Sequence, residues 1–144
     1  MWDYLVKREN KRYVQINYEQ QSCLDSNHIL VFDEDYVGFL FLQQLLESHG
    51  AIVHRSILSA AGPPVFSCLE FIDLIIVRNT LPLDWMNKKV PVFKLEYRIP
   101  VLFISEGKIE GRSDYFWQFV DLVVDSGFDS TQIMNSVNEI IRLK

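Results

Sequence analysis

The chain has 144 residues, of which 49% are hydrophobic and 13% aromatic, and it carries a formal net charge of −5. This length and composition fit one domain with a sizeable buried core and argue against a disordered chain. The negative charge makes nucleic acid an unfavourable partner, because affinity for its phosphate backbone depends on lysine and arginine.

Cysteine, histidine and apolar runs exclude further classes of protein. Cys23 and Cys68 form no disulfide framework and match no metal-ligand spacing, which favours a reducing cytoplasmic setting. The three histidines are scattered, without an HxxxH arrangement. No apolar run reaches the length of a membrane span. We therefore expect a cytoplasmic protein, or the cytoplasmic part of a larger membrane-anchored protein, with no metal, no cofactor and no membrane contact by this segment.

Residues 1–19 contain two short runs in which apolar and polar residues alternate, as in β-strands, with the polar Arg8–Lys11 between them. This pattern predicts a β-hairpin, followed by a polar linker at residues 20–27. We thus divide the chain into a hairpin with its linker, residues 1–27, and a main domain, residues 28–144.

In the main domain, compact apolar strands alternate with helical patterns, which indicates βαβ units and a parallel sheet. The predicted strands are Ile29–Phe32, Ala51–Leu58, Asp73–Val77, Val101–Ser105 and Leu122–Val124. The predicted helices are Tyr36–Ser48, Val65–Phe71 and a last helix that Ser130 or Thr131 caps. Pro91 lies inside the remaining helical region, which we expect to be short, kinked or replaced by extended chain.

Four segments of the main domain resemble the signature blocks of receiver domains from two-component response regulators: ILVFDED, DLIIVRNTLP, IPVLFIS and DLVVDSGF. They occur in this order over about four fifths of the chain. The resemblance implies an α/β fold of the flavodoxin-like receiver type, a five-stranded parallel sheet of order 2-1-3-4-5 with helices on both faces. One helix would be short or replaced by a loop, because Pro91 and the glycine-containing Glu106–Asp114 interrupt helical patterns.

The phosphorylation site of the family can be compared with this sequence one position at a time. Two acids after the first strand bind Mg²⁺ in receivers, and Asp33 and Glu34 occupy those places. The phosphoacceptor aspartate lies four residues before a proline, and counting back from Pro82 reaches Arg78. A guanidinium cannot accept a phosphoryl group as a carboxylate does. Ser105 fits the serine or threonine switch position of the family.

Other working parts of a receiver are replaced. Asp125 stands where receivers have a lysine after the fifth strand, and Leu122 stands at the aromatic switch position. Because clustered carboxylates need a cation and arginine binds them bidentately, we expect Arg78 to form a salt-bridge cluster in place of Mg²⁺. Its acidic members would be Asp33, Glu34 and Asp125. The alternative is that Arg78 turns outward, where an ion pair contributes only about 0–1 kcal/mol.

Four aromatic residues gather where receivers place a face for partner docking: Tyr115, Phe116, Trp117 and Phe119. Core packing can account for roughly half of them. Four aromatic residues within five positions cannot all point inward from one helix, and aromatic residues are enriched at interfaces. We therefore predict that this group contributes to partner binding.

The resemblance implies a non-phosphorylatable pseudo-receiver that is not an enzyme and that docks on a histidine kinase, a phosphotransfer domain or a response regulator. The N-terminal hairpin resembles the final strand pair of histidine-kinase ATP-binding domains, which precede receivers in hybrid kinases. The loop replacing a helix resembles the degenerate receivers of Rcs-type phosphorelays. Both likenesses are at the level of the fold and imply a place in a phosphorelay.

Two alternatives remain open. The first is a small flavodoxin-like enzyme or nucleotide binder that uses Asp33, Ser105 and Asp125, although no glycine-rich phosphate loop follows Phe32. The second is a receiver that is phosphorylated at a non-standard acid, such as Asp35 or Asp125.

Overall fold

The structure is a computed structural model that describes residues 26–56, 69–105, 114–125 and 129–142. Within this part of the chain, five parallel strands form one sheet in the order β2-β1-β3-β4-β5. The strands are β1 (His28–Phe32), β2 (Ile52–Ser56), β3 (Leu74–Arg78), β4 (Val101–Ile104) and β5 (Leu122–Val124). The predicted strand order and receiver fold class are therefore confirmed.

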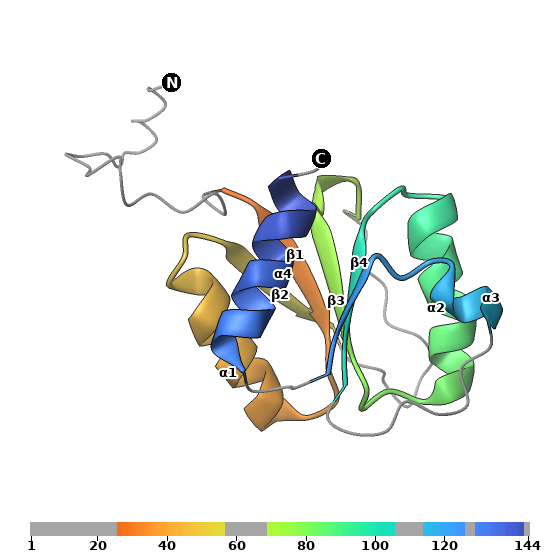
Figure 1. Cartoon of the computed structure of the whole chain (residues 1–144), viewed down its shortest axis with the longest axis horizontal. Helices are drawn as coiled ribbons and strands as arrows, with labels where there is room; N and C mark the ends of the chain where they lie inside the picture. Colours follow the sequence, from red (N-terminus) through yellow and green to blue (C-terminus); the bar gives the residue numbers. More distant parts are fainter. Residues whose placement is uncertain (1–25, 57–68, 106–113, 126–128, 143–144) are drawn as a thin grey trace.

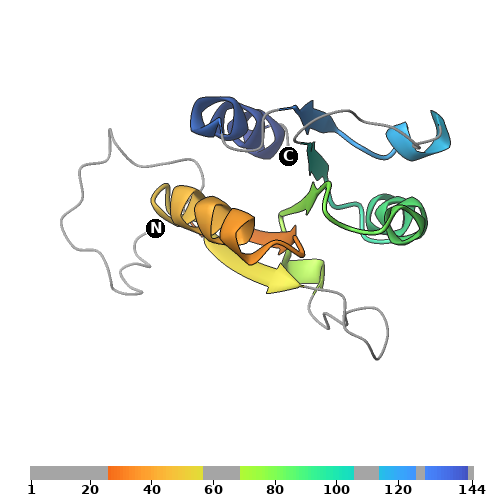
Figure 2. The same ribbon diagram turned by 90° about the horizontal axis from the view of Figure 1, so that it is seen from below.

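Helices cover both faces of this sheet (Figures 1 and 2). They are α1 (Tyr36–Glu47), α2 (Leu83–Leu95), α3 (Asp114–Trp117) and α4 (Ser130–Arg142), with a 3-10 turn, η2, at Leu69–Phe71. Seen from below in Figure 2, α1 and α4 lie on one side of the sheet and α2 and α3 on the other. None of these described helices is long and apolar enough to cross a membrane.

Alternation along the central strands supplies one hydrophobic core to each face. In β1, Ile29 and Val31 pack toward α1 and α4, whereas Leu30 and Phe32 pack toward α2 and α3. All five residues of β3 are buried, as expected for a strand with neighbours on both sides and helices above and below. The continuous apolar run of the sequence therefore marks the middle of the sheet.

Helix α1 begins and ends where the sequence places it. The Asp35 side chain accepts a hydrogen bond from the backbone N–H of Val37 at 3.2 Å, which caps the first turn. After the helix, Gly50 adopts φ 97°, a conformation that costs glycine little and other residues much more. The chain can thus turn directly into β2.

The prediction that one helix is short is confirmed by α3, which begins at the end of Glu106–Asp114. Two details of the predicted helices were wrong. Helix α2 is neither short nor replaced by extended chain, since it continues through Pro91 to Leu95. Buried Met86, Val90 and Phe93 hold α2 on the sheet, and this packing outweighs the backbone hydrogen bond that proline removes. The cap of α4 is the Asp129 carboxylate, which accepts from Gln132 N at 3.0 Å.

Two further details complete the comparison with the predicted elements. Only residues 69–71 of the helix predicted at Val65–Phe71 are described, and they form the 3-10 turn η2. The predicted N-terminal hairpin lies outside the described residues.

Candidate functional site

Three polar side chains are buried where β1, β3 and β4 end. The strand register pairs Phe32 with Val77 and Arg78 with Ile104, so these strands end nearly level at the carboxyl edge of the sheet. Asp33, Arg78 and Ser105 follow from these ends, and their side chains are 0%, 1% and 0% exposed. In this fold ligands bind at the carboxyl edge, which makes these buried polar groups the candidate site.

Asp33 and Arg78 form a buried ion pair. Arg78 Nε lies 2.9 Å from Asp33 Oδ2, although the N–H direction is not that of a well-aligned hydrogen bond. Because the guanidinium keeps its charge at all accessible pH values, Asp33 gives that charge a partner inside the protein. The alternative of a solvated Arg78 is therefore wrong.

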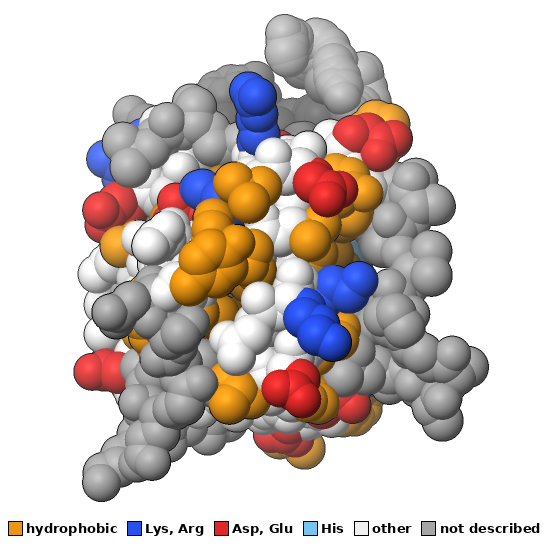
Figure 3. Space-filling view, turned by 90° about the vertical axis from the view of Figure 1, so that its right-hand side faces the viewer, with side chains coloured by type: hydrophobic (Ala, Val, Ile, Leu, Met, Phe, Trp, Pro, Cys, Tyr) orange, Lys and Arg blue, Asp and Glu red, His pale blue; other side chains and the backbone are white. Residues whose placement is uncertain are grey.

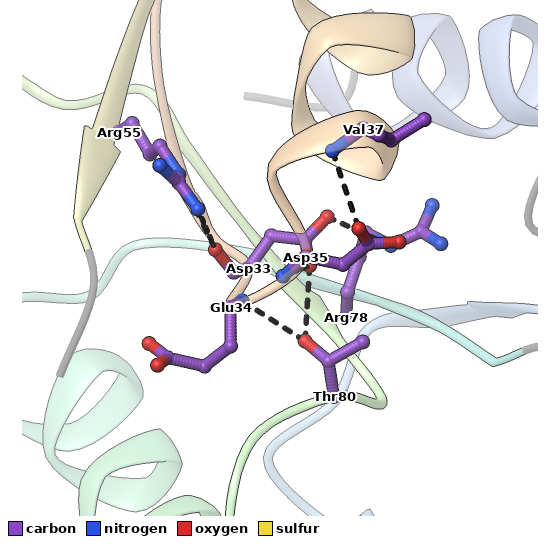
Figure 4. Close-up of polar contacts among 7 residues, drawn as sticks. All are labelled: Asp33, Glu34, Asp35, Val37, Arg55, Arg78 and Thr80. Carbon is purple, nitrogen blue, oxygen red and sulfur yellow. Dashed lines mark hydrogen bonds and ion pairs between the residues drawn. The ribbon is translucent and has the colours of Figure 1, made fainter.

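Several hydrogen bonds hold Asp33 in this position (Figure 4). Its Oδ1 atom accepts from the Thr80 hydroxyl at 2.9 Å and from the backbone N–H of Asp35 at 2.8 Å. The Thr80 hydroxyl oxygen also accepts from the backbone N–H of Glu34 at 3.0 Å. Arg55 donates from Nη2 to the Asp33 carbonyl oxygen at 2.9 Å. Backbone and side chain of Asp33 are thus fixed by three residues, Asp35, Arg55 and Thr80.

Opposing influences act on the acidity of Asp33. Burial raises the pKa of this carboxyl group, while the Asp35 N–H, the Arg78 charge and the Thr80 hydroxyl lower it, and burial is the larger effect. These contacts therefore offset part of the cost of burying the carboxylate form. Loss of the arginine would leave the same carboxyl group buried without a compensating charge.

Gly38 makes room for this ion pair. It lies in α1 and is buried. A Cβ atom built on Gly38 would lie 3.0 Å from Arg78 Cζ, from Arg78 Nη2 and from Asp33 Oδ2. Real Cβ atoms are rarely this close to other atoms, so any larger residue would push the pair apart. The glycine in the first turn of α1 thus makes room for the arginine of β3, the strand next to β1 in the sheet.

Of the remaining predicted site residues, Glu34 and Asp125 are exposed and Ser105 is buried. The side chain of Glu34 is exposed and points away from Arg78 (Figure 4). Asp125 is exposed, and its Oδ1 atom accepts from Gln132 Nε2 at 3.4 Å. Ser105 is buried, with Asn79 Nδ2 3.5 Å from its Oγ. The predicted cluster of three acids is therefore corrected to a pair, because the ends of β1 and β5 are separated by two strands.

The pair does not fit a magnesium site. Mg²⁺ needs several free oxygen ligands, and the Asp33 oxygens already face a hydroxyl, a backbone N–H and a guanidinium. A positive charge at 2.9 Å also opposes any cation at Oδ2. Among the described residues, no group of three histidine, cysteine or acidic side chains could hold a metal ion.

The four predicted docking aromatics divide between core and surface. Phe116 and Phe119 are 1% and 8% exposed and belong to the core on the α2 side of the sheet, which agrees with the expectation that core packing accounts for about half of the group. Trp117 is half-buried and meets Phe103 edge-on at 5.6 Å. Tyr115 is 55% exposed. A short helix directs about half of its side chains toward the core. Tyr115 is the exposed member of this group and remains its candidate for partner binding.

Three residues that shape the site were missed from the sequence: Gly38, Arg55 and Thr80. Each carried a weak signal. Glycine is unusual inside a helix, arginine is the one charged residue of β2, and threonine follows the strand end by two positions. The guanidinium of Arg55 also lies 5.1 Å from the Tyr36 ring and 5.2 Å from the Phe39 ring, which ties β2 to α1.

The sequence matches no protein-family model and no curated protein. Solved structures do resemble it. A CheY-like response-regulator receiver domain protein from Methanospirillum hungatei has a TM-score of 0.60 and 16% identity, over 83% of this chain and 96% of that one. A receiver domain protein from Clostridium thermocellum has a TM-score of 0.61 and 17% identity, over 81% and 95%.

A protein from Burkholderia pseudomallei named as pilus assembly-related has a TM-score of 0.63 and 14% identity, over 93% of this chain and 96% of that one. Identities this low reveal a shared fold and no more. The chain therefore has the fold of response-regulator receiver domains, as the four sequence blocks predicted.

Proposed function

We propose that this chain is a non-phosphorylated pseudo-receiver, a protein-interaction module of two-component or phosphorelay signalling. The supporting observation is the buried pair of Arg78 and Asp33, 2.9 Å apart, at the carboxyl edge of the sheet. The sequence resemblance to receivers supports the assignment of Arg78 to the phosphoacceptor position, four residues before Pro82. A guanidinium there offers no carboxylate oxygen for an acyl phosphate.

The ion pair would replace both the metal ion and the phosphoryl group. In a receiver these two ligands neutralise and bridge the acids of the site, whereas here a covalently attached cation meets Asp33. The fold would consequently stay in one state, and its role would be docking on a histidine kinase, a phosphotransfer domain or a response regulator in the cytoplasm. No catalytic step is part of this proposal.

Phosphodonor treatment tests the first half of the proposal. The full chain is incubated with acetyl phosphate and Mg²⁺, and its intact mass is measured beside that of an active receiver. We expect no added phosphoryl group and no Mg²⁺-dependent rise in melting temperature, because a ligand that does not bind cannot stabilise. Phosphorylation of Asp35 or Asp125, located by peptide mass, would contradict the proposal.

Binding measurements test the second half. The full chain is titrated against the histidine kinases, phosphotransfer domains and response regulators of its host, with and without phosphodonor. We expect one of these partners to bind with an affinity that does not change when the donor is added. A melting-temperature rise with flavin or a nucleotide, and no binding to any of these proteins, would favour the small-molecule alternative instead.

A further inference from the structure

Thr80 is an exposed residue whose hydroxyl contacts the buried carboxylate of Asp33. It lies in the connection between β3 and α2, two residues beyond Arg78. Asn79 N still donates to the Ile104 carbonyl of β4 at 2.9 Å, so the pairing of the sheet extends to the residue before Thr80. Substitution of an exposed residue usually changes stability little. Thr80 differs, because its side chain is bonded to a charge inside the protein.

The Thr80 hydroxyl joins two connections of the chain (Figure 4). It donates to Asp33 Oδ1 at 2.9 Å and accepts from the backbone N–H of Glu34 at 3.0 Å. Asp33 and Glu34 belong to the connection between β1 and α1, whereas Thr80 belongs to the one between β3 and α2. A hydroxyl that donates and accepts at the same time polarises both bonds, so the loss of one weakens the other.

The two oxygens of the Asp33 carboxylate have different partners. Oδ1 accepts from the Thr80 hydroxyl and from Asp35 N at 2.8 Å, while Oδ2 lies 2.9 Å from Arg78 Nε. Loss of the hydroxyl would leave Oδ1 with one of its two donors. The torsion that turns a carboxylate about its Cβ–Cγ bond is broad and resists rotation weakly. The direction of Oδ2 toward Arg78 therefore depends on what holds Oδ1.

The same carboxylate influences the start of α1. Asp33 Oδ1 accepts from Asp35 N, and the Asp35 side chain in turn caps α1 by accepting from Val37 N at 3.2 Å. The first turn of α1 exposes Tyr36 and Val37, by 57% and 69%. The Thr80 hydroxyl is thus connected, through Asp33 and Asp35, to exposed apolar side chains at the carboxyl edge.

We propose that Thr80 is a positioning residue through which the exposed surface controls the buried ion pair. Its hydroxyl sets the Asp33 carboxylate so that Oδ2 faces Arg78, and loss of that hydrogen bond loosens the pair. A binding partner that takes over the Thr80 hydroxyl would thus act on Arg78 from outside without entering the core. This inference does not rest on the proposed signalling role, since the contacts are those of the free chain.

Nuclear magnetic resonance of the full chain tests this role. Two quantities are measured in wild type and in Thr80→Val, which removes the hydroxyl and keeps the branched shape: the hydrogen-exchange rate of Arg78 Nε–H and the pKa of the Asp33 carboxyl group. We expect exchange to become roughly ten times faster, because the ion pair opens more often. The pKa of Asp33 should rise above its wild-type value, since the Thr80 hydrogen bond lowers it.

Three further variants separate the hydroxyl from other effects. Thr80→Ser restores the donor and should return both quantities to near their wild-type values. Thr131→Val, at an exposed threonine in the first turn of α4, is the matched control and should change neither quantity. If Thr80→Val does not fold, Thr80→Ala removes the same hydroxyl without an added methyl group and takes its place.

An unchanged exchange rate and an unchanged Asp33 pKa in folded Thr80→Val would overturn the proposal. So would a change that Thr80→Ser does not reverse, because the hydroxyl would then not be the group responsible. Loss of folding in both Thr80→Val and Thr80→Ala would also contradict it, since Thr80 would then support the whole fold rather than the ion pair.

Discussion

At the carboxyl edge of the sheet, the ion pair of Arg78 and Asp33 is almost completely buried, with exposed fractions of 1% and 0%. At the amino edge, the pair of Lys94 and Asp121 is exposed by 34% and 31%, although its atoms are closer, at 2.6 Å. Distance alone would rank the second pair as stronger. Burial reverses this order, because water screens one pair and is excluded from the other.

The carboxylates of the two edges consequently have different roles. At the amino edge, Asp73 accepts from the backbone N–H of His28 and Asp121 from that of Val101, both at 2.8 Å. Each carboxylate satisfies the first N–H of a neighbouring strand, which is a role in folding. At the carboxyl edge, Asp33 instead compensates a charge that the sheet has buried. We therefore expect substitutions at the carboxyl edge, which contains the buried charge, to change the free energy of unfolding most.

The largest effect is expected from Arg78→Ala. This change leaves the Asp33 carboxylate buried without its partner, which should lower the free energy of unfolding by about 3–5 kcal/mol. Urea unfolding at neutral pH measures the change. Asp33→Leu/Arg78→Met, which replaces both charges by apolar side chains, is the control and should recover most of the loss. A loss below about 1 kcal/mol for Arg78→Ala would place this pair with ordinary surface pairs.

Gly38→Ala should have the next largest effect. In an exposed helix alanine is about 1 kcal/mol better than glycine. Here the new methyl group would lie 3.0 Å from Arg78 and Asp33, and such overpacking costs about 1–3 kcal/mol. We therefore expect a net destabilisation in thermal unfolding. In an Arg78→Ala background the same change should become neutral or stabilising, and an unchanged cost there would show that the arginine is not what Gly38 accommodates.

The fold and the site differ in how far the sequence predicts them. Uninterrupted apolar runs such as Leu74–Val77 specify buried strands, because only a central strand is covered on both faces. The position of Arg78 followed from the strand end. The role of Gly38 did not, because it depends on which helix packs over the arginine. The continuity of α2 through Pro91 depends likewise on packing that no local pattern contains.

Lys94→Ala tests the contribution of the exposed ion pair at the amino edge. Because the Lys94–Asp121 pair is one-third exposed, its loss should cost at most about 1 kcal/mol, and less at high salt. Asp121→Ala should cost more, since it also removes the acceptor of Val101 N. Unfolding curves at low and high salt measure both changes. Equal costs for the two variants would mean that the carboxylate does not support the start of β4.

The smallest effect is a pH dependence at the amino edge. Nδ1 of His28 and Nε2 of His54 are 3.0 Å apart, and the ring planes differ by 9°. Nitrogens this close fit an edge-to-edge N–H···N hydrogen bond better than stacked rings. Burial first, and the charge of His28 second, lower the pKa of His54 below its ordinary 6.5. At least one ring must therefore stay neutral for this bond to persist.

The lowered pKa of His54 determines how stability changes with pH. The folded state binds the His54 proton less tightly than the unfolded state, so the stability contribution is present above about pH 6.5 and is lost as the pH falls through the lower folded value. Wild type should therefore lose more stability than His54→Gln between about pH 7.5 and about pH 5. If both proteins lose the same free energy of unfolding over this pH range, protonation of His54 does not affect stability. The contact between His28 and His54 would then make no pH-dependent contribution to folding.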